Sequence, residues 1–249
     1  MRPLALALLL AAPAAAAPSW DIQVSQAGEA LQSAFAAAAQ DCGSPLVSVS
    51  AETAEDAALA CQGFKRALRF MTERGAAPKT PVKIILADRF PERYAKYGVE
   101  NMHGFYDTDT HEVYLKSYRR FAQTPPENTP LGISPSRELL ASYIAHEVGH
   151  HISVQAYAGP ARLIPHAQGE YISYSLQLAT MDAGLREELV GRYRKDGRGG
   201  FESTDQISMT LHDMDPQAFA VKSYLFFATD AGKDALRGML AGKVPDSGL

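Results

Sequence analysis

The pentapeptide His146-Glu147-Val148-Gly149-His150 constrains the fold more than any other part of this chain. Two histidines four residues apart lie on one face of an α-helix, about one turn from each other, so both imidazoles can reach a single metal ion. The glutamate beside the first histidine faces the same cavity and is not required as a ligand, so it is free to accept a proton from an attacking water. The pattern predicts a helix with two metal ligands, His146 and His150, and a general base, Glu147.

The residues around the pentapeptide favour this helix. Ser134-Pro135 supplies an N-cap and a proline at the first helical position, Glu138 falls in the first turn, and Ala158-Gly159-Pro160 ends the helix. Gly149 costs the helix about 1 kcal/mol relative to alanine, which favours a position where another backbone or a substrate approaches closely. The alternative is a surface helix that carries the motif by chance. Apolar residues recur at helical spacing: Leu139, Leu140, Tyr143, Ile144 and Val148.

Residues 1–17 have the pattern of a secretory signal peptide. Arg2 precedes an apolar run over Leu4–Leu10 and an Ala-x-Ala site, so we expect cleavage near Ala17. A retained N-terminal anchor is the alternative, although the run is short and alanine-rich for a membrane span. No later segment approaches the ~20 apolar residues that a span requires. The sequence therefore predicts an exported protein, periplasmic or secreted, without a membrane span.

The chain has two cysteines and a formal net charge of −4. An even number of cysteines in an exported chain favours a disulfide between Cys42 and Cys61, and closing a loop of roughly 20 residues stabilises by about 3 kcal/mol. Two buried thiols are the alternative, whereas zinc ligation is disfavoured because no His or Cys lies at metal-binding spacing near them. The mildly acidic charge, without a basic cluster in the sequence, argues against nucleic acid or an anionic membrane as a partner.

Hydrophobic patterning predicts a small sheet among helical segments. Besides the helix of the pentapeptide, the expected helices cover residues 26–40, 52–74, 169–195, 203–212 and 216–242. A glycine-rich linker over residues 197–200 follows the helix over 169–195, and a break at Gly232 is expected in the helix over 216–242. The expected strands cover residues 81–86, 103–106 and 112–115, the last two as a hairpin. A small sheet followed by a mostly helical half predicts an α+β fold. The length fits one main domain after an N-terminal helical segment or subdomain over residues 18–80.

The pentapeptide and the segment Gly169-Glu170-Tyr171-Ile172-Ser173 together resemble the zincin metallopeptidases, and within them the gluzincins. Glu170 follows His150 by 20 residues, which is similar to the thermolysin-type arrangement. The segments Phe219–Leu225 and Ala235–Leu240 are similar to the closing helices of bacterial gluzincins. The resemblance covers roughly residues 80–242. It implies a zincin-like domain over residues 81–249 with a mixed sheet ahead of the motif helix, one Zn²⁺ per chain, and Glu170 as the third ligand.

These ligands would give a catalytic rather than a structural metal site. Two imidazoles and one carboxylate leave zinc one position for a water, whose pKa falls toward ~7. Glu147 would take the proton of that water as it attacks a scissile carbonyl and pass it to the leaving amine. We therefore expect a zinc-dependent peptidase acting on a peptide or protein substrate. Glu170 has a second interpretation as an exposed carboxylate at a helix N-terminus, and the other candidates for the third ligand are His166, Asp213, Asp215 and Glu202.

Two further side chains are candidates for the site. His212 is a candidate donor to the developing oxyanion, because the neighbouring Asp213 could raise its pKa and orient it. The alternative is a surface histidine near a helix end. Tyr174 stands where the thermolysin-type pattern often has an acidic residue that orients a zinc-bound histidine. Its hydroxyl could take that role, or Tyr174 is a core aromatic residue.

The hairpin before the motif helix is the expected strand edge for pairing with an extended peptide, and an ordinary internal hairpin is the alternative. The alternative to an enzyme is a non-catalytic binding or structural protein of the periplasm with a zincin-like scaffold. The intact Glu147 favours catalysis, because a structural zinc site is closed by a fourth ligand and has no need of a free base.

Overall fold

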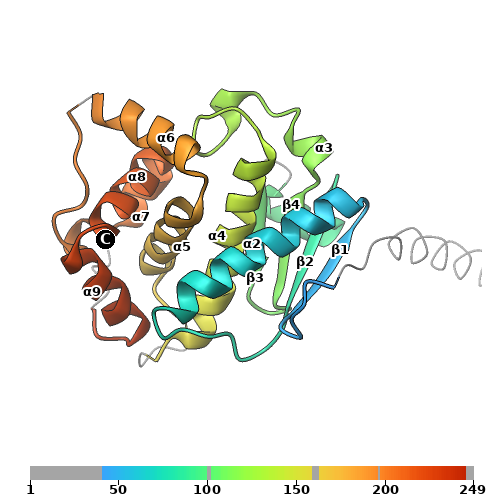
Figure 1. Cartoon of the computed structure of the whole chain (residues 1–249), viewed down its shortest axis with the longest axis horizontal. Coiled ribbons are helices and arrows are strands. Elements are labelled where there is room, and N and C mark those ends of the chain that lie inside the picture. Colours follow the sequence, from blue (N-terminus) through green and yellow to red (C-terminus); the bar gives the residue numbers. More distant parts are fainter. Residues whose placement is uncertain (1–40, 100–101, 159–162, 196, 245–249) are drawn as a thin grey trace, which may run out of the picture. The chain divides into compact units, whose positions relative to one another are not determined.

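A computed structural model describes residues 41–99, 102–158, 163–195 and 197–244. These residues form an α+β fold with a small mixed sheet and a mostly helical remainder, as expected from the sequence (Figure 1). The expected signal peptide over residues 1–17 and the expected helix over residues 26–40 lie outside the described residues.

The sheet has the strand order β1-β2-β4-β3. Its strands are β1 (Val47–Ala51), β2 (Val82–Ala87), β3 (Gly104–Asp107) and β4 (Glu112–Lys116). The central strand β2 pairs in parallel with β1 and β4, whereas β3 pairs antiparallel with β4. The predicted strand over residues 81–86 and the predicted hairpin are confirmed. The strand β1 was not expected, because it is short and only two of its five residues are buried. The strand β3 forms one edge of the sheet.

Helices α2 (Ala54–Thr72) and α4 (Arg137–Ala156) pack on the sheet and on each other, with α2 against β1 and β2 and α4 against β3 and β4 (Figure 1). The Thr53 hydroxyl caps α2 by accepting a hydrogen bond from the Asp56 amide. Ser136 caps α4 by accepting from the Leu139 amide at 3.1 Å. The motif helix therefore begins two residues later than the expected start at Ser134-Pro135, because Ser136 is the residue whose hydroxyl satisfies the first free amides.

The helical half is more divided than expected. The single helix expected over residues 169–195 is two helices, α5 (His166–Thr180) and α6 (Ala183–Lys195). The chain breaks between them where the Asp182 carboxylate accepts a hydrogen bond from the Leu185 amide at 3.1 Å and so starts a new helix. The remaining short elements are α3 (Tyr118–Phe121) and the 3₁₀ turns Glu92–Tyr97, Pro126–Asn128 and Thr204–Gln206.

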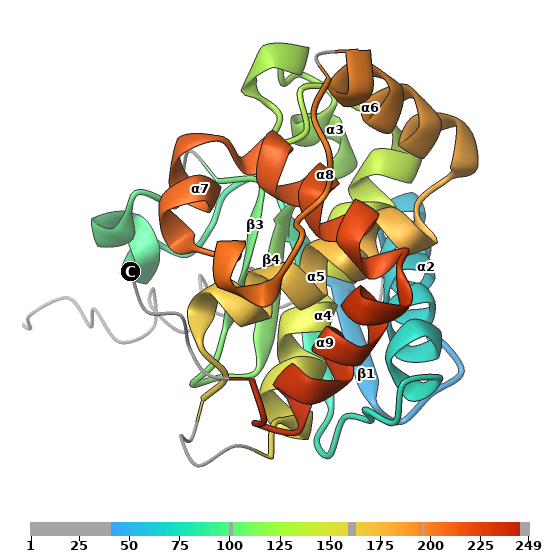
Figure 2. The ribbon, with the colours of Figure 1, turned by 90° about the vertical axis from the view of Figure 1, so that its left-hand side faces the viewer.

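The C-terminal segments also differ from the expectation. They form α7 (Met209–Met214), α8 (Pro216–Phe227) and α9 (Asp230–Leu240), capped by Ser208, Asp215 and Thr229. The break expected at Gly232 lies at Thr229 instead, because the hydroxyl of that residue accepts from the Gly232 amide and starts α9. Figure 2 shows α8 and α9 in front of α5, which both helices contact.

The segment before residue 80 is part of the same structure as the rest of the described chain. Its strand β1 pairs with β2, and its helix α2 packs against α4. The boundary expected at residue 80 therefore does not divide the described chain. The predicted disulfide between Cys42 and Cys61 is present, with both residues buried. Within the described ranges, no helix combines the length and the apolar character needed to cross a bilayer.

The contact between α2 and α4 depends on a glycine. A Cβ atom added at Gly63 would lie 2.5 Å from Cγ2 of Ile144 and 2.8 Å from the backbone oxygen of Ala141. Both atoms belong to α4, one helical turn before the pentapeptide, so the position of the metal-binding helix rests on this close approach.

We predict that Gly63→Ala lowers the free energy of unfolding by about 1–3 kcal/mol, because overpacking outweighs the helix propensity gained by alanine. Gly191→Ala in α6 is the matched control, since nothing lies within 4 Å of the added Cβ. It is expected to stabilise by up to about 1 kcal/mol. Urea unfolding followed by circular dichroism measures both. Equal stability of the Gly63 variant and the parent would contradict the close packing.

Candidate metal centre

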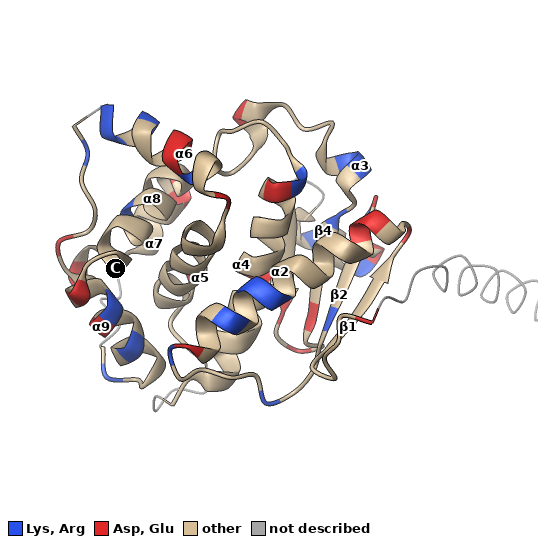
Figure 3. Ribbon diagram, in the orientation of Figure 1, with Lys and Arg blue, Asp and Glu red and all other residues tan. Residues whose placement is uncertain are grey.

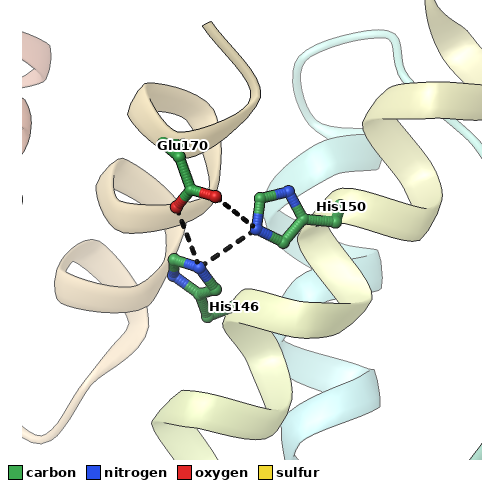
Figure 4. Close-up of side chains that lie close together, drawn as sticks. All are labelled: His146, His150 and Glu170. Atoms are coloured by element: carbon green, nitrogen blue, oxygen red, sulfur yellow. Dashed lines mark hydrogen bonds and ion pairs between the residues drawn. The ribbon is translucent and has the colours of Figure 1, made fainter. Parts of the chain in front are cut away.

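Three side chains from two helices converge in the structure (Figure 4). His146 and His150 extend from α4, and Glu170 extends from the first turns of α5. The Nε2 atoms of the two histidines are 3.1 Å apart. The Oε2 atom of Glu170 lies 3.4 Å from Nε2 of His146, and its Oε1 atom lies 3.4 Å from Nε2 of His150. This group could hold a metal ion, because one ligand atom from each residue lies within 4.8 Å of the others.

Burial and charge set the protonation of this group. Burial raises the pKa of Glu170, but the charges of His150 and His146 and hydrogen bonds to His146 and His166 outweigh it and hold that pKa well below its usual value. Burial lowers the pKa of His150 to about 4. Burial acts in the same direction on His146, but its hydrogen bond to Glu170 and the charge of Glu170 raise the pKa above the usual value. Metals bind to a carboxylate anion and to neutral imidazoles. The lowered pKa values of Glu170 and His150 favour these forms, whereas the raised pKa of His146 means that its ring gives up a proton when a metal binds.

A chain of buried hydrogen bonds orients the His146 ring. Ser142 donates to the backbone oxygen of Leu139 at 2.7 Å, so its own oxygen accepts from Nε2 of Gln177 at 3.1 Å. The Oε1 atom of Gln177 then faces Nδ1 of His146, also at 3.1 Å. This arrangement places the proton on Nδ1 and leaves the lone pair of Nε2 directed at the centre. This role of Gln177 was not predicted from the sequence.

Tyr174, the candidate for orienting a ligand, lies one turn before Gln177 on α5. Its ring packs against the His146 imidazole with centroids 4.4 Å apart, and against Phe219 at 5.8 Å. Burial is the first cause that raises the pKa of Tyr174 well above its usual value. These contacts agree with the interpretation of Tyr174 as a core aromatic residue, and the orienting hydrogen bond comes from Gln177 instead.

Glu147 lies at the same cavity but outside the ligand group. Burial raises the pKa of its carboxyl to about 7, although the charge of His146 and a hydrogen bond from the backbone amide of Tyr106 oppose the rise. Tyr106 belongs to β3, so the edge strand and the motif helix together fix the direction of this carboxylate.

The cavity in front of His146, His150 and Glu170 has a volume of about 700 Å³. The strand β3, the helices α4 and α5 and the start of α8 contribute to its wall. Its apolar lining comes from Met102, Phe105, Tyr143, Val154, Leu163, Ile164 and Pro216, among others. The cavity is therefore a largely apolar cleft with its polar groups concentrated at the candidate centre, as is typical of sites for small ligands and peptides.

Two further predicted histidines also line this cavity. Nε2 of His212 lies 3.6 Å from Oε2 of Glu170, and its Nδ1 atom is 3.0 Å from Oδ1 of Asp213. Nε2 of His166 lies 3.4 Å from Oε1 of Glu170, and the side chain of His166 is 72% exposed. The structure thus brings His212 to the centre from a helix some 40 residues away in sequence, with Asp213 as its partner.

The acidic rivals for the third ligand position lie elsewhere. Asp213 is largely exposed and pairs with His212, whereas Asp215 caps α8 and lies 3.6 Å from Arg198. Glu202 is exposed, and none of these three carboxylates lines the cavity. Among the acidic candidates from the sequence, Glu170 is the one that the fold places beside both histidines.

Gly149 explains how α5 comes so close to the ligands. A Cβ atom at this position would lie 3.1 Å from Oγ of Ser173 and 3.3 Å from Cδ1 of Leu176. The close approach expected at this glycine is therefore made by another helix, α5, at Ser173, three residues after Glu170.

A second hydrogen-bond network links β3 to α4 behind the cavity. The Tyr106 hydroxyl lies 2.9 Å from Nδ1 of His111 and 3.2 Å from Nδ1 of His151, a fully buried residue next to the candidate ligand His150. Nε2 of His151 lies 3.0 Å from the backbone oxygen of Thr80. Sequence reasoning missed this network, because its members come from separate segments and no local pattern connects them.

We predict that Gln177→Leu lowers the zinc affinity of the purified protein by about 10–100-fold, because the orienting partner of a ligand histidine is lost. Gln62→Leu is the control: it removes a glutamine–carboxylate hydrogen bond between α2 and α4 outside the cavity. Its zinc affinity is expected to match that of the parent. Competition with a chromophoric chelator measures both, and an unchanged affinity of the Gln177 variant would contradict the assigned role.

Comparison with known proteins identifies a family but no function. A family model described as a family of unknown function (DUF6639) matches residues 47–246. The matched range contains the whole sheet, the helices α4 and α5 and every residue of the candidate centre. Neither a curated protein nor a solved structure matches the chain.

Proposed function

The chain belongs to the DUF6639 family, whose function is unknown, and we propose from its site that it is a zinc-dependent peptidase of the gluzincin type. One observation carries the proposal. Two imidazole nitrogens and a buried carboxylate from a second helix face one another (Figure 4). Glu147, on the same helix turn as the histidines, lines the same cavity but stays outside the group. Catalytic zinc sites have three protein ligands and one open position, and they are accompanied by a free base.

The donor set fits zinc. A tetrahedral ion with ligand bonds near 2.0–2.1 Å separates its ligand atoms by about 3.3 Å. The Nε2 atoms of the two histidines are 3.1 Å apart, close to this value. Each histidine lies 3.4 Å from a different oxygen of Glu170: His146 from Oε2 and His150 from Oε1. With one ligand atom taken from each residue, the three atoms lie within 4.8 Å of one another. Imidazole nitrogens together with a carboxylate suit zinc, whereas magnesium and calcium prefer ligand sets built from oxygen alone. His146, His150 and Glu170 would hold one Zn²⁺ per chain.

The neighbouring residues supply the remaining chemistry. Zinc, when bound, polarises a carbonyl and lowers the pKa of a water. The Glu147 carboxylate, held by the Tyr106 amide, accepts the proton of the attacking water and returns it to the leaving nitrogen. His212, with Asp213 on its Nδ1 atom, directs Nε2 toward the centre and donates a hydrogen bond to the oxygen that becomes negative.

The edge strand favours an extended peptide as the substrate. Gly104, Phe105 and Tyr106 of β3 line the cavity, and β3 has a neighbour in the sheet on one side only. An extended chain can add to such an edge through backbone hydrogen bonds, and this mode of binding requires no particular sequence. The cleft of about 700 Å³ offers room for a few residues.

We place the enzyme outside the cytoplasm, in the periplasm or secreted. The disulfide between Cys42 and Cys61 supports this, because such bonds persist in oxidising compartments. The signal-peptide pattern of residues 1–17 supports the same location.

We predict that Glu147→Gln lowers kcat on casein or a fluorogenic peptide pool by about 10²–10⁴-fold while the zinc content stays at one ion per chain, because only the proton acceptor is lost. Glu138→Gln is the control on the same helix. Its carboxylate pairs with Arg66 and does not line the cavity, so activity is expected to persist. Metal analysis accompanies each assay. Full zinc loading of the parent without cleavage of any peptide would favour the non-catalytic binding protein.

We predict that Glu170→Gln loses zinc, whereas His166→Gln keeps one zinc ion per chain. Glu170 is 7% exposed and faces both histidines, whereas the His166 side chain is largely in solvent. Removal of zinc by a chelator is expected to abolish cleavage, and added zinc to restore it. Elemental analysis after dialysis reports the stoichiometry. Zinc lost from the His166 variant but kept by the Glu170 variant would reverse the ligand assignment.

A further inference from the structure

A second cavity, of about 510 Å³, adjoins the candidate metal centre. It shares His103 and Asn128 with the larger cavity, so the two lie next to each other. The rest of its lining comes from the end of β4, from α3 and from the loop that follows: Lys116, Arg120, Gln123, Thr124 and Pro125. Two of these side chains are cationic and none is acidic. We call this second cavity the basic pocket.

The two cations of the basic pocket have no acidic partner within the described part of the chain. Arg120 donates a hydrogen bond to Gln123, also in the pocket lining, at 3.2 Å. The preceding residue, Arg119, pairs instead with Asp88 and Glu52 on the other side of the turn. Basic residues gather at α3 and the adjoining part of β4 in Figure 3. One arginine of this short helix is therefore neutralised, and the other remains available.

The surroundings of the two cations favour an anion between them. The pKa of Lys116 is lowered, first by burial and then by the positive charge of Arg120. Like charges held together in a partly buried site repel each other, and a bound anion relieves this repulsion. Lysine and arginine are the usual partners of carboxylates, and the guanidinium group can bind both oxygens.

The position of the basic pocket relates it to the edge strand. His103 directly precedes β3, and its backbone oxygen accepts a hydrogen bond from the Lys116 amide at 3.0 Å. The His103 ring stacks on Tyr143 of α4, one helical turn before Glu147, at a centroid distance of 6.1 Å. The pocket thus lies at the end of the cleft where β3 begins. A peptide that pairs antiparallel with β3 runs toward this end with its C-terminal part.

We propose that the basic pocket binds a carboxylate of the substrate on the C-terminal side of the bond that is cut, through Lys116 and Arg120. This inference rests on the proposed peptidase function. The carboxylate comes from an acidic side chain or from the C-terminus of the substrate itself, since both present the same group. The enzyme then prefers acidic peptides or positions close to a chain end.

Binding to the zinc-loaded Glu147→Gln protein tests the proposal without cleavage. The probes are three acetylated tripeptides that differ in the last residue: a glutamate amide, a glutamine with a free carboxylate, and a glutamine amide. Calorimetry at low ionic strength is expected to give at least tenfold tighter binding of one or both charged probes than of the neutral probe. The charged probe that binds more tightly identifies the source of the carboxylate.

Substitutions in the same protein separate the basic pocket from other binding sites. Lys116→Gln with Arg120→Gln is expected to abolish the preference for charged probes. Arg119→Gln removes the same charge from the same turn outside the pocket and is expected to keep the preference. Arg120→Gln alone is expected to weaken the preference for charged probes at least threefold. Because Arg120 is exposed, this single variant keeps the test possible if the double variant does not fold.

Equal binding of all three probes, or a preference that survives both substitutions, would overturn the proposal. If zinc itself bound the carboxylate of the probe, the preference for charged probes would survive both substitutions. Because these measurements need no turnover, an absence of peptidase activity in the Glu147 experiment leaves them interpretable. A failure of the carboxylate proposal can therefore be told apart from a failure of the peptidase proposal.

Discussion

The packing of α5 against α4 at Gly149 is the contact on which the candidate centre depends. Ser173 of α5 lies where a side chain at position 149 would be, and Glu170 is one turn away on the same helix. This short distance between the helices lets a carboxylate reach two imidazoles at 3.4 Å. A second glycine, Gly63, lets α2 approach α4 even more closely, at Ile144 and Ala141. The motif helix α4 thus packs closely against α2 and α5 at two glycines, Gly63 of α2 and Gly149 of α4.

One face of α5 provides several parts of the centre at helical spacing. Glu170, Ser173 and Gln177 stand at positions i, i+3 and i+7, which share a face. They supply a candidate ligand, the contact with Gly149, and the hydrogen-bond partner of the candidate ligand His146. Because all three sit on one rigid element, a shift of α5 would displace the ligand and the orienting amide together. The ring of Tyr174, on the same helix, packs against the His146 imidazole.

Local sequence signals predicted the elements that short-range geometry controls. The hairpin and the helix α2 were predicted because their alternation and helical spacing are visible within a few residues. The prediction of a single helix over residues 169–195 was wrong. The apolar pattern continues across the break between α5 and α6, and only the Asp182 cap separates the two helices. The strand β1 was missed, since a strand of this length takes its pairing from a neighbour more than 30 residues away. The basic pocket left no sequence signal, because Lys116 and Arg120 meet His103 only through the pairing of β3 with β4.

The sequence by itself placed His146, Glu147 and His150 on one helical turn, because helix periodicity is a local property of the chain. It also indicated two joined cysteines and a small sheet before the helices. It left Glu170, His166, Asp213, Asp215 and Glu202 as alternatives for the third ligand. Only the tertiary structure placed Glu170 beside both histidines, since the approach of α5 depends on glycines and small side chains whose partners lie far apart in sequence. The same holds for Gln177, whose role arises from a hydrogen bond across two helices.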